Sequence, residues 1–337
     1  MSDNSSVLTA VLVAVLILLV LILVGGALFM LFMSFSEKVF KKLFKRPKPL
    51  PQVDRSPKRI DRSTIVGRGK NWFYTFHNEW LGVRTTSFDG CQLSGYYRPS
   101  SDRTCRNMVI LVHDYDESPA EMAAYARLMM RKVQCHCIIT HMRGHGMSDG
   151  KNYTWGLMES VDLDTWFTFT KRRLGENCRI YLVARGAGAT ACLLAAQQQS
   201  FDDCVCGIIA DSPMASLTDF LKATLPQSTK INPDWIIAQV RRLAQNKFGF
   251  DINRCDCAVH ANSIKVPVLI FQGGEDDITP PSGAKGIYDN LRSRKRMVIV
   301  NNAKHTECYE KSQAMYEREV QKFIESCVVR LVKIGRL

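Results

Sequence analysis

The residues from 181 to 191 carry the strongest signal for chemistry in this 337-residue chain. They read Tyr-Leu-Val-Ala-Arg-Gly-Ala-Gly-Ala-Thr-Ala, which is an apolar strand-like run, a glycine-rich turn and a small-residue run that favours a helix. This order is typical of a nucleophile elbow, G-x-S-x-G, in which a sharp strand-to-helix turn presents a serine above a parallel sheet. Gly186 then stands at the position of the serine, and Ala184 at that of the first glycine. The sequence therefore predicts the turn without its nucleophile.

Glycine at position 186 has a physical explanation. An elbow residue holds a strained backbone conformation that costs roughly 1–3 kcal/mol and persists for function. Glycine has no Cβ and adopts those angles freely, so a chain relieved of catalysis keeps the turn without strain. Short glycine motifs also match by chance, and the run from Arg185 to Gly188 taken alone is equally well explained as a glycine-rich helix start.

An uncharged stretch rich in Val, Leu and Ile covers residues 7–33. About 20 such residues cross a bilayer as a helix. Residues 1–6 contain Asp3 and no Lys or Arg, which does not fit the basic start of a cleaved signal peptide. We therefore expect an uncleaved transmembrane anchor over residues 1–36, with the lipid bilayer as a partner.

Basic residues follow the apolar stretch closely: Lys38, Lys41, Lys42, Lys45, Arg46, Lys48, Lys58, Arg59 and Arg62. The positive-inside rule places this flank, and with it the domain of a single-pass protein, on the cytoplasmic side of a membrane. The cluster also suits anionic lipid headgroups, although a stop-transfer flank in a solvated linker explains it as well. Because much of the formal net charge of +13 lies here, charge is weak evidence for binding of nucleic acid, and no nucleic-acid motif is visible.

Twelve cysteines include three C-x-C pairs, at 135/137, 204/206 and 255/257. In a cytoplasmic domain we expect them to be reduced thiols. A spacing of two puts both side chains on one face of a strand, where two thiolates could bind zinc. No C-x-x-C or His-rich partner motif accompanies them, however. We interpret the pairs as small apolar residues on buried strands, and expect neither a metal nor a cofactor.

Apolar runs alternate with helical patterns through most of the chain after a basic, proline-broken linker at 37–70. Alternating runs joined by Asp89-Gly90 predict a hairpin. Uniformly apolar strands between helices indicate a doubly wound, mainly parallel α/β sheet in a domain covering 71–337. We interpret a mainly helical insertion at about 216–264 as a cap over the site. The continuous strands are predicted near 108–112, 137–140, 181–185, 206–210, 266–271 and 296–300.

Five motifs in a fixed order make the chain resemble the α/β-hydrolase family, in its serine-aminopeptidase and lysophospholipase-like branch. The resemblance covers roughly residues 81–324, nearly everything after the linker, and it implies the α/β-hydrolase fold. Five ordered matches are far more specific than any one of them. In chain order, the motifs are Thr86–Gly90, Val109–His113, Arg143–Ser148, Asp211–Pro213 and Gln272–Pro280.

The resemblance also implies roles for individual residues. The catalytic acid of the family aligns with Asp276 and the catalytic histidine with His305, in the family's order of nucleophile, acid and histidine. The oxyanion donors would be backbone N–H groups near Tyr115 and Ala187. Together with the degenerate nucleophile position at Gly186, these residues define the candidate site.

The chain departs from the family's pattern where chemistry would occur. Gly186 has no hydroxyl, so no acyl-enzyme can form on it. Asp114 replaces the glycine of the family's His-Gly pair, and its carboxylate would oppose a developing oxyanion. His141 stands where relatives usually have an aspartate. Several departures in one pocket indicate relaxed catalytic constraint.

Three functions are compatible with these residues. The first, which Gly186 and Asp114 favour, is a membrane-anchored pseudo-hydrolase that binds or scaffolds, with its protein partner unknown. The second is an active ester, thioester or peptide hydrolase in which the Asp276–His305 pair works without a serine; a nucleophile displaced to Thr190 or Ser212 is its least favoured form. The third is a receptor whose cap shelters an apolar acyl or lipid-like ligand.

Overall fold

The computed structural model describes residues 2–46, 60–225, 231–333 and 335–336 of the chain. These residues form two compact units. Residues 1–43 and 224–252 make up the smaller unit, and residues 44–223 and 253–337 the larger one. The larger unit contains the whole sheet and every residue predicted for the site.

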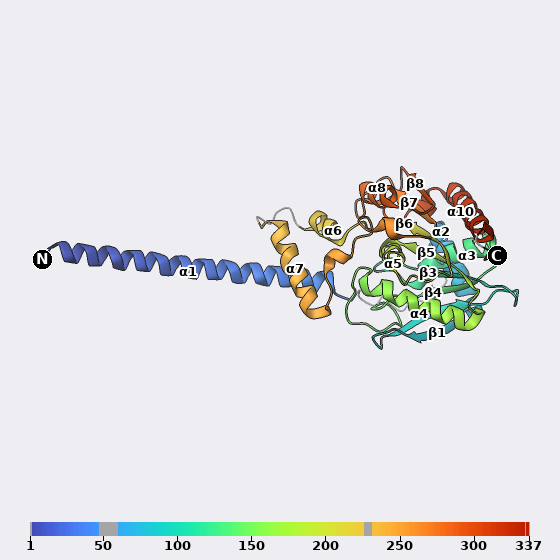
Figure 1. Cartoon of the computed structure of the whole chain (residues 1–337), viewed down its shortest axis with the longest axis horizontal. Coiled ribbons are helices and arrows are strands. Elements are labelled where there is room, and N and C mark those ends of the chain that lie inside the picture. The colour runs from blue at the N-terminus through green and yellow to red at the C-terminus, as the bar shows by residue number, and fades with distance from the viewer. Residues whose placement is uncertain (1, 47–59, 226–230, 334, 337) are drawn as a thin grey trace. The chain divides into compact units, whose positions relative to one another are not determined.

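Eight strands form one sheet in the order β1-β2-β4-β3-β5-β6-β7-β8 (Figure 1). β2 pairs antiparallel with β1 and β4, and all remaining neighbours pair parallel. The doubly wound, mainly parallel sheet and the hairpin at Asp89-Gly90 are therefore confirmed. The strands are β1 Leu81–Thr86, β2 Gln92–Arg98, β3 Asn107–Val112, β4 His136–Thr140, β5 Arg179–Arg185, β6 Val205–Asp211, β7 Val268–Gly273 and β8 Lys295–Val300.

Helices cover both faces of this sheet. Three helices, α2 (Ile65–Thr75), α3 (Ala123–Lys132) and α10 (Gln313–Lys333), contribute to one apolar core cluster with the strands. α5 (Gly186–Ala196) lies outside that cluster, packs on β5 and β6 and contacts α4 (Leu157–Leu174). Because both faces are covered, strands β4, β6 and β7 are buried along their whole length, as their uniformly apolar sequences require. Two further helices of this unit are α8 (Pro281–Asn290) and α9 (Cys308–Lys311).

The register of the two central strands decides which residues meet at the site. β3 and β5 are parallel neighbours, and Val112 at the end of β3 lies opposite Ala184 in β5. Parallel strands end at the same edge of a sheet, so the residues two positions further along each chain, Asp114 and Gly186, lie beside each other. β7, the strand that precedes Asp276, ends at the same edge.

The smaller unit contains the long helix α1 (Ser2–Leu43). Its large apolar side chains between Val7 and Leu31 are all exposed, and it is long and apolar enough to cross a membrane. α7 (Pro233–Phe248) packs against its far end, where the rings of Phe40 and Phe248 stack with centroids 5.7 Å apart.

The structure revises the predicted boundaries of two segments. α1 continues to Leu43 and α2 begins at Ile65, so helices occupy both ends of the segment predicted as a linker at 37–70; Lys48, Lys58 and Arg59 lie outside the described residues. Thr64 and the distant Glu310 accept hydrogen bonds from the first N–H groups of α2, which explains why the sequence alone did not reveal this start. The predicted cap is helical, with α6 (Leu217–Thr224) and α7, but its residues 224–252 group with α1.

Candidate active site

The turn between β5 and α5 is occupied by Gly186, as predicted. Its φ of +48° lies in the left-handed region, which residues with a Cβ rarely adopt. A Cβ built on Gly186 would lie only 2.0–2.4 Å from the carboxylate atoms of Asp114. Two independent constraints, the backbone angle and the occupied space, therefore require glycine here.

The carboxylate of Asp114 is bound by the two backbone N–H groups predicted as oxyanion donors. Its Oδ1 accepts hydrogen bonds from the N–H of Ala187 and from that of Tyr115, both at 2.7 Å. Ala187 N lies in the first turn of α5, where the helix dipole favours a negative charge. A protein carboxylate thus fills the position in which an acyl enzyme stabilises the oxygen of its substrate.

His305 lies between two carboxylates. Its Nδ1 is 2.8 Å from Asp276 Oδ2, and its Nε2 is 3.1 Å from Asp114 Oδ2. Asp276 Oδ1 is fixed in turn by the backbone N–H groups of Ile278 and Thr279. The structure therefore brings together all the predicted site residues, as a continuous row of Asp114, His305 and Asp276 beside Gly186.

The charges in this row stabilise the imidazolium form of His305. Burial alone would lower its pKa, but the hydrogen bonds and negative charges of Asp114 and Asp276 outweigh burial and raise the pKa of His305 to about 10. Burial disfavours both carboxylates as anions, yet their hydrogen bonds and ion pairs with His305 hold the pKa of each below its usual value. At neutral pH the row is an anion–cation–anion arrangement.

The row has a measurable signature in the pH dependence of stability. The pKa of His305 is about 10 in the folded chain and near 6.5 in an unfolded one, so its stabilising contribution is complete below pH 6.5 and is lost as pH rises towards 10. Replacing Asp114 by Asn should lower the pKa of His305 by about 1–3 units and flatten this decline. Nitrogen NMR of His305 and urea unfolding between pH 6 and 10 check both effects; an unchanged pKa in Asp114→Asn would contradict the assigned contact.

Comparison with known proteins supports the same reading of the fold. A model of the serine aminopeptidase S33 family matches residues 254–312, the segment that holds Asp276 and His305. The esterase Pf2001 of Pyrococcus furiosus superposes with a TM-score of 0.61 at 20% identity, over 84% of this chain and 98% of that one. Est1E of Butyrivibrio proteoclasticus gives 0.55 at 15% identity, over 74% and 99%. This chain is an α/β-hydrolase-fold protein.

Two curated relatives also align along most of this chain. The uncharacterized protein YqkD of Bacillus subtilis (strain 168) is 24% identical over 238 residues, which is 70% of this chain and 76% of the relative. The uncharacterized protein YfhR of Escherichia coli O157:H7 is 21% identical over 250 residues, 73% of this chain and 81% of the relative. The α/β-hydrolase fold that the resemblance implied is thus confirmed, and the segment with Asp276 and His305 is similar to the serine aminopeptidase family.

A second layer of residues, which the motifs did not identify, holds Asp114 in place. Glu117 Oε2 accepts the backbone N–H of Asp114 at 3.0 Å, and Glu117 Oε1 pairs with Arg185 Nη1 at 3.1 Å. Arg185 also donates to the carbonyl of Thr306, next to His305, at 3.1 Å. Arg185 directly precedes Gly186, so an arginine inside the glycine-rich turn was the one available signal in the sequence.

Thr190 and Ser212, the two positions considered for a displaced nucleophile, both have hydroxyls engaged in hydrogen bonds. The hydroxyl of Thr190 donates to the carbonyl of Gly186 and accepts the N–H of Met214 at 2.9 Å. The hydroxyl of Ser212 accepts the N–H of Thr306 at 3.1 Å. Both side chains are fully buried, and in the described part of the chain neither hydroxyl bonds to His305.

His141 lies outside the row and is a packing residue. Its ring contacts Tyr96, with centroids 5.3 Å apart, and fills the space beside Gly146. Burial lowers the pKa of His141 to about 4, so the ring is neutral at physiological pH. The histidine in place of the family's usual aspartate therefore affects the packing under the loop from 143 to 150. It does not affect the row of Asp114, His305 and Asp276.

All six members of the C-x-C pairs are buried, as predicted, but only Cys137 and Cys206 lie in strands, β4 and β6, so the prediction that the pairs lie on strands is wrong for 255/257. Both sulfurs of Cys135 and Cys137 are buried and lie 3.8 Å apart, and all twelve cysteines are free thiols. Among the residues that the structure describes, no group of three or more His, Cys, Asp or Glu side chains is arranged to hold a metal ion.

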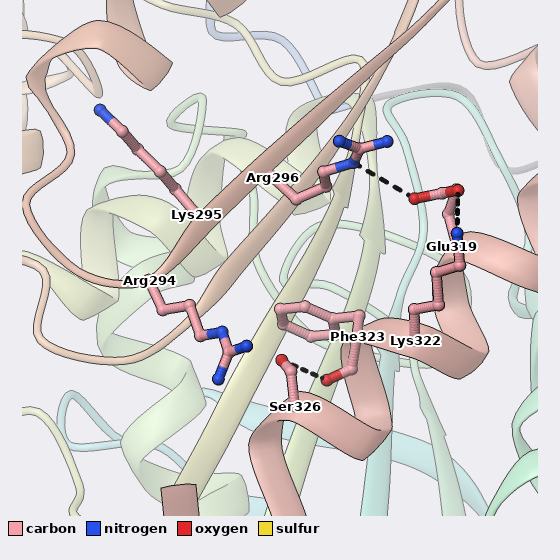
Figure 2. A pocket seen from close by; sticks show the side chains of 7 residues that line it. All are labelled: Arg294, Lys295, Arg296, Glu319, Lys322, Phe323 and Ser326. Atoms are coloured by element: carbon pink, nitrogen blue, oxygen red, sulfur yellow. Dashed lines mark hydrogen bonds and ion pairs between the residues drawn. The ribbon is translucent and has the colours of Figure 1, made fainter. Parts of the chain in front are cut away.

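A surface cavity of about 330 Å³ lies between β8 and α10, and none of the site residues lines it. Figure 2 shows the side chains of Arg296 and Lys322 converging on Glu319, which pairs with both. Lys295 points away from them, and its ammonium group instead caps carbonyls at the end of α8, including that of Leu291. The positive charge around this cavity is thus largely engaged by the protein itself.

Proposed function

We propose that this chain is a membrane-anchored α/β-hydrolase-like protein that is catalytically impaired and acts by binding or scaffolding. The observation that carries the proposal is the position of the Asp114 carboxylate, on the N–H groups of Tyr115 and Ala187 and against Gly186. A substrate carbonyl would have to displace a buried anion from these donors, and it would then meet no nucleophile at position 186. Serine-hydrolase chemistry thus lacks two of its requirements at once.

The state of His305 supports the same conclusion. A general base must be unprotonated at the working pH, and its pKa is best matched to that pH. The two neighbouring carboxylates raise the pKa of His305 to about 10, so the ring carries its proton near pH 7. His305 in this arrangement is an ion-pair partner, not a proton acceptor.

Membrane anchoring rests on α1. An exposed apolar surface of this length is stable in a bilayer but not in water. The cations that follow it, among them Lys38, Lys41 and Lys42, favour the orientation with the α/β domain on the cytoplasmic side. As the ligand of such a membrane-anchored protein we propose an apolar acyl or lipid-like molecule.

The second candidate function is an active ester, thioester or peptide hydrolase based on Asp276 and His305. The intact 2.8 Å contact between these two side chains favours it. Such an enzyme would need neutral His305, so its activity would rise steeply between pH 7 and 10, and it would disappear in His305→Ala.

The test uses the full-length chain in detergent micelles. Wild type is expected to show no p-nitrophenyl ester hydrolysis above the buffer rate at pH 7, no labelling by a fluorophosphonate, and no change on His305→Ala. Hydrolysis that depends on His305 would establish the second candidate instead. Titrating the same preparations with acyl compounds tests the ligand, because binding to the folded state raises the melting temperature; an unchanged melting temperature would remove the ligand from the proposal.

A further inference from the structure

The outer face of α7 is the surface from which a new inference can be drawn. One side of this helix is buried and carries Ile236, Ile237, Val240 and Ala244. The opposite side exposes Trp235, Ala238 and Arg242, whose spacing of three and four residues aligns them in one stripe. Trp235 is 66% exposed, which is unusual for the largest apolar side chain.

The contact between α7 and α1 places the C-terminal end of α7 relative to a bilayer. Phe40 and Leu43 of α1 are buried, and Phe40 stacks on Phe248 while the ammonium group of Lys247 lies 5.6 Å from its ring. The apolar stretch at residues 7–33 measures roughly 40 Å as a helix and so fills a hydrocarbon core of about 30 Å. Phe40 lies about 10 Å beyond the end of this apolar stretch. The part of α1 that α7 contacts is therefore at the level of the lipid headgroups.

The charge of this region matches an anionic surface. Beyond residue 33, the described part of the smaller unit carries six cations against Glu37, Asp234 and Asp251. Glu37 pairs with Lys41, and Asp251 with Arg241. The cations come from both helices: Lys38, Lys41, Lys42, Arg241, Arg242 and Lys247.

We propose that α7 is a membrane-interface helix whose outer stripe, Trp235 to Arg242, binds the anionic phospholipid headgroups of the leaflet from which α1 emerges. Tryptophan is enriched at this depth because its ring is apolar and its N–H is polar, and arginine attracts the lipid phosphates. The inference rests on the proposed anchoring by α1. It gives the predicted cap a second role, since one of its helices contacts the membrane.

The experiment compares three alanine-to-cysteine variants of the full-length chain, each spin-labelled and reconstituted in vesicles. Ala238→Cys reports the stripe, Ala27→Cys reports the apolar part of α1, and Ala314→Cys is a matched control on the exposed side of α10. Eleven of the twelve native cysteines are buried, and Cys91→Ser removes the one that is partly exposed. Collision with oxygen reports contact with lipid, and collision with a nickel chelate reports contact with water.

In vesicles of phosphatidylcholine with 30% phosphatidylserine, about the acidity of a cytoplasmic leaflet, we expect the nickel accessibility at 238 to be at least about fivefold lower than at 314. The nickel accessibility at 238 should rise again in pure phosphatidylcholine and in Arg242→Gln, because both remove the charge attraction. It should also rise in salt near 1 M, which shortens the range of this attraction to about 3 Å. Trp235→Ala should reduce the oxygen accessibility at 238.

Two results would overturn the proposal and identify which part fails. Equal nickel accessibility at 238 and 314, with lipid contact at 27, would leave the anchor in place and show that α7 does not touch the membrane. Water contact at 27 would contradict the anchor itself. Shielding at 238 that is the same in both lipids and indifferent to Arg242→Gln would exclude anionic headgroups as the partner.

Discussion

The double variant Gly186→Ser/Asp114→Gly is expected to hydrolyse p-nitrophenyl esters and to react with a fluorophosphonate, whereas Gly186→Ser alone is expected to do neither. The single variant places a serine Cβ within 2.0–2.4 Å of the Asp114 carboxylate, at a φ of +48°. Because the Asp114 carboxylate is held by Tyr115, Ala187 and His305, it cannot yield this space without losing several hydrogen bonds. The single variant is therefore both inactive and less stable than wild type.

Removing the Asp114 carboxylate in the double variant removes three obstacles to ester hydrolysis at once. The N–H groups of Tyr115 and Ala187 become free to bind a substrate oxygen. The new serine hydroxyl gains room, and His305 loses one of the two anions that keep it protonated, so it can act as a base. We expect ester turnover at least about 100-fold above that of Asp114→Gly, since triad members act as a unit.

Three controls define the outcome of this experiment. Asp114→Gly alone should be silent because it has no nucleophile, and adding His305→Ala to the double variant should abolish the new activity. If Gly186→Ser matches the double variant, the Asp114 carboxylate is not an obstacle. If the double variant is well folded and still silent, the pocket lacks more than its nucleophile and a free oxyanion site.

The sequence predicted where the candidate site residues lie relative to the strands, but not the contact on which the proposed function rests. Local patterns after strands were enough to identify Gly186, Asp276 and His305 from the sequence. The hydrogen bond from the N–H of Ala187 to Asp114, 73 residues away along the chain, depends on the register of β3 against β5 and on the orientation of one carboxylate. Asp114 was interpreted as a charge opposing an oxyanion, whereas in the structure its carboxylate binds the two N–H groups that were predicted as oxyanion donors.

Other features that the sequence did not predict also depend on contacts between residues far apart in the chain. The pair formed by Glu117 and Arg185 has no motif, and it exists because the loop after β3 passes over the turn after β5. The start of α2 is capped by Glu310, which is 245 residues from Ile65. The described part of the segment 216–264 is mainly helical, as its pattern predicted, but no local signal indicated that α7 packs on α1.

The replacement of Arg143 by Met is expected to have the largest effect on stability. Arg143 is almost fully buried, and its guanidinium group pairs with Asp162 at 2.6 Å and with Asp89 at 2.7 Å. Asp162 also accepts the hydroxyl of Ser87 at 2.5 Å and is itself buried. Removing the cation leaves a buried carboxylate without its counter-charge, which typically costs about 3–5 kcal/mol of unfolding free energy.

The matched comparison separates loss of the charge pair from loss of packing. Asp162→Asn in the Arg143→Met background removes the stranded charge while keeping the hydrogen bond from Ser87, and it should recover a large part of the loss. Urea unfolding of the full-length chain in micelles measures both changes. A loss below about 1 kcal/mol in Arg143→Met would mean that the pair behaves as a surface salt bridge, contrary to its burial. Arg143 belongs to the motif from 143 to 148. A large loss of unfolding free energy in Arg143→Met would therefore also show that this motif stabilises the fold, independently of catalysis.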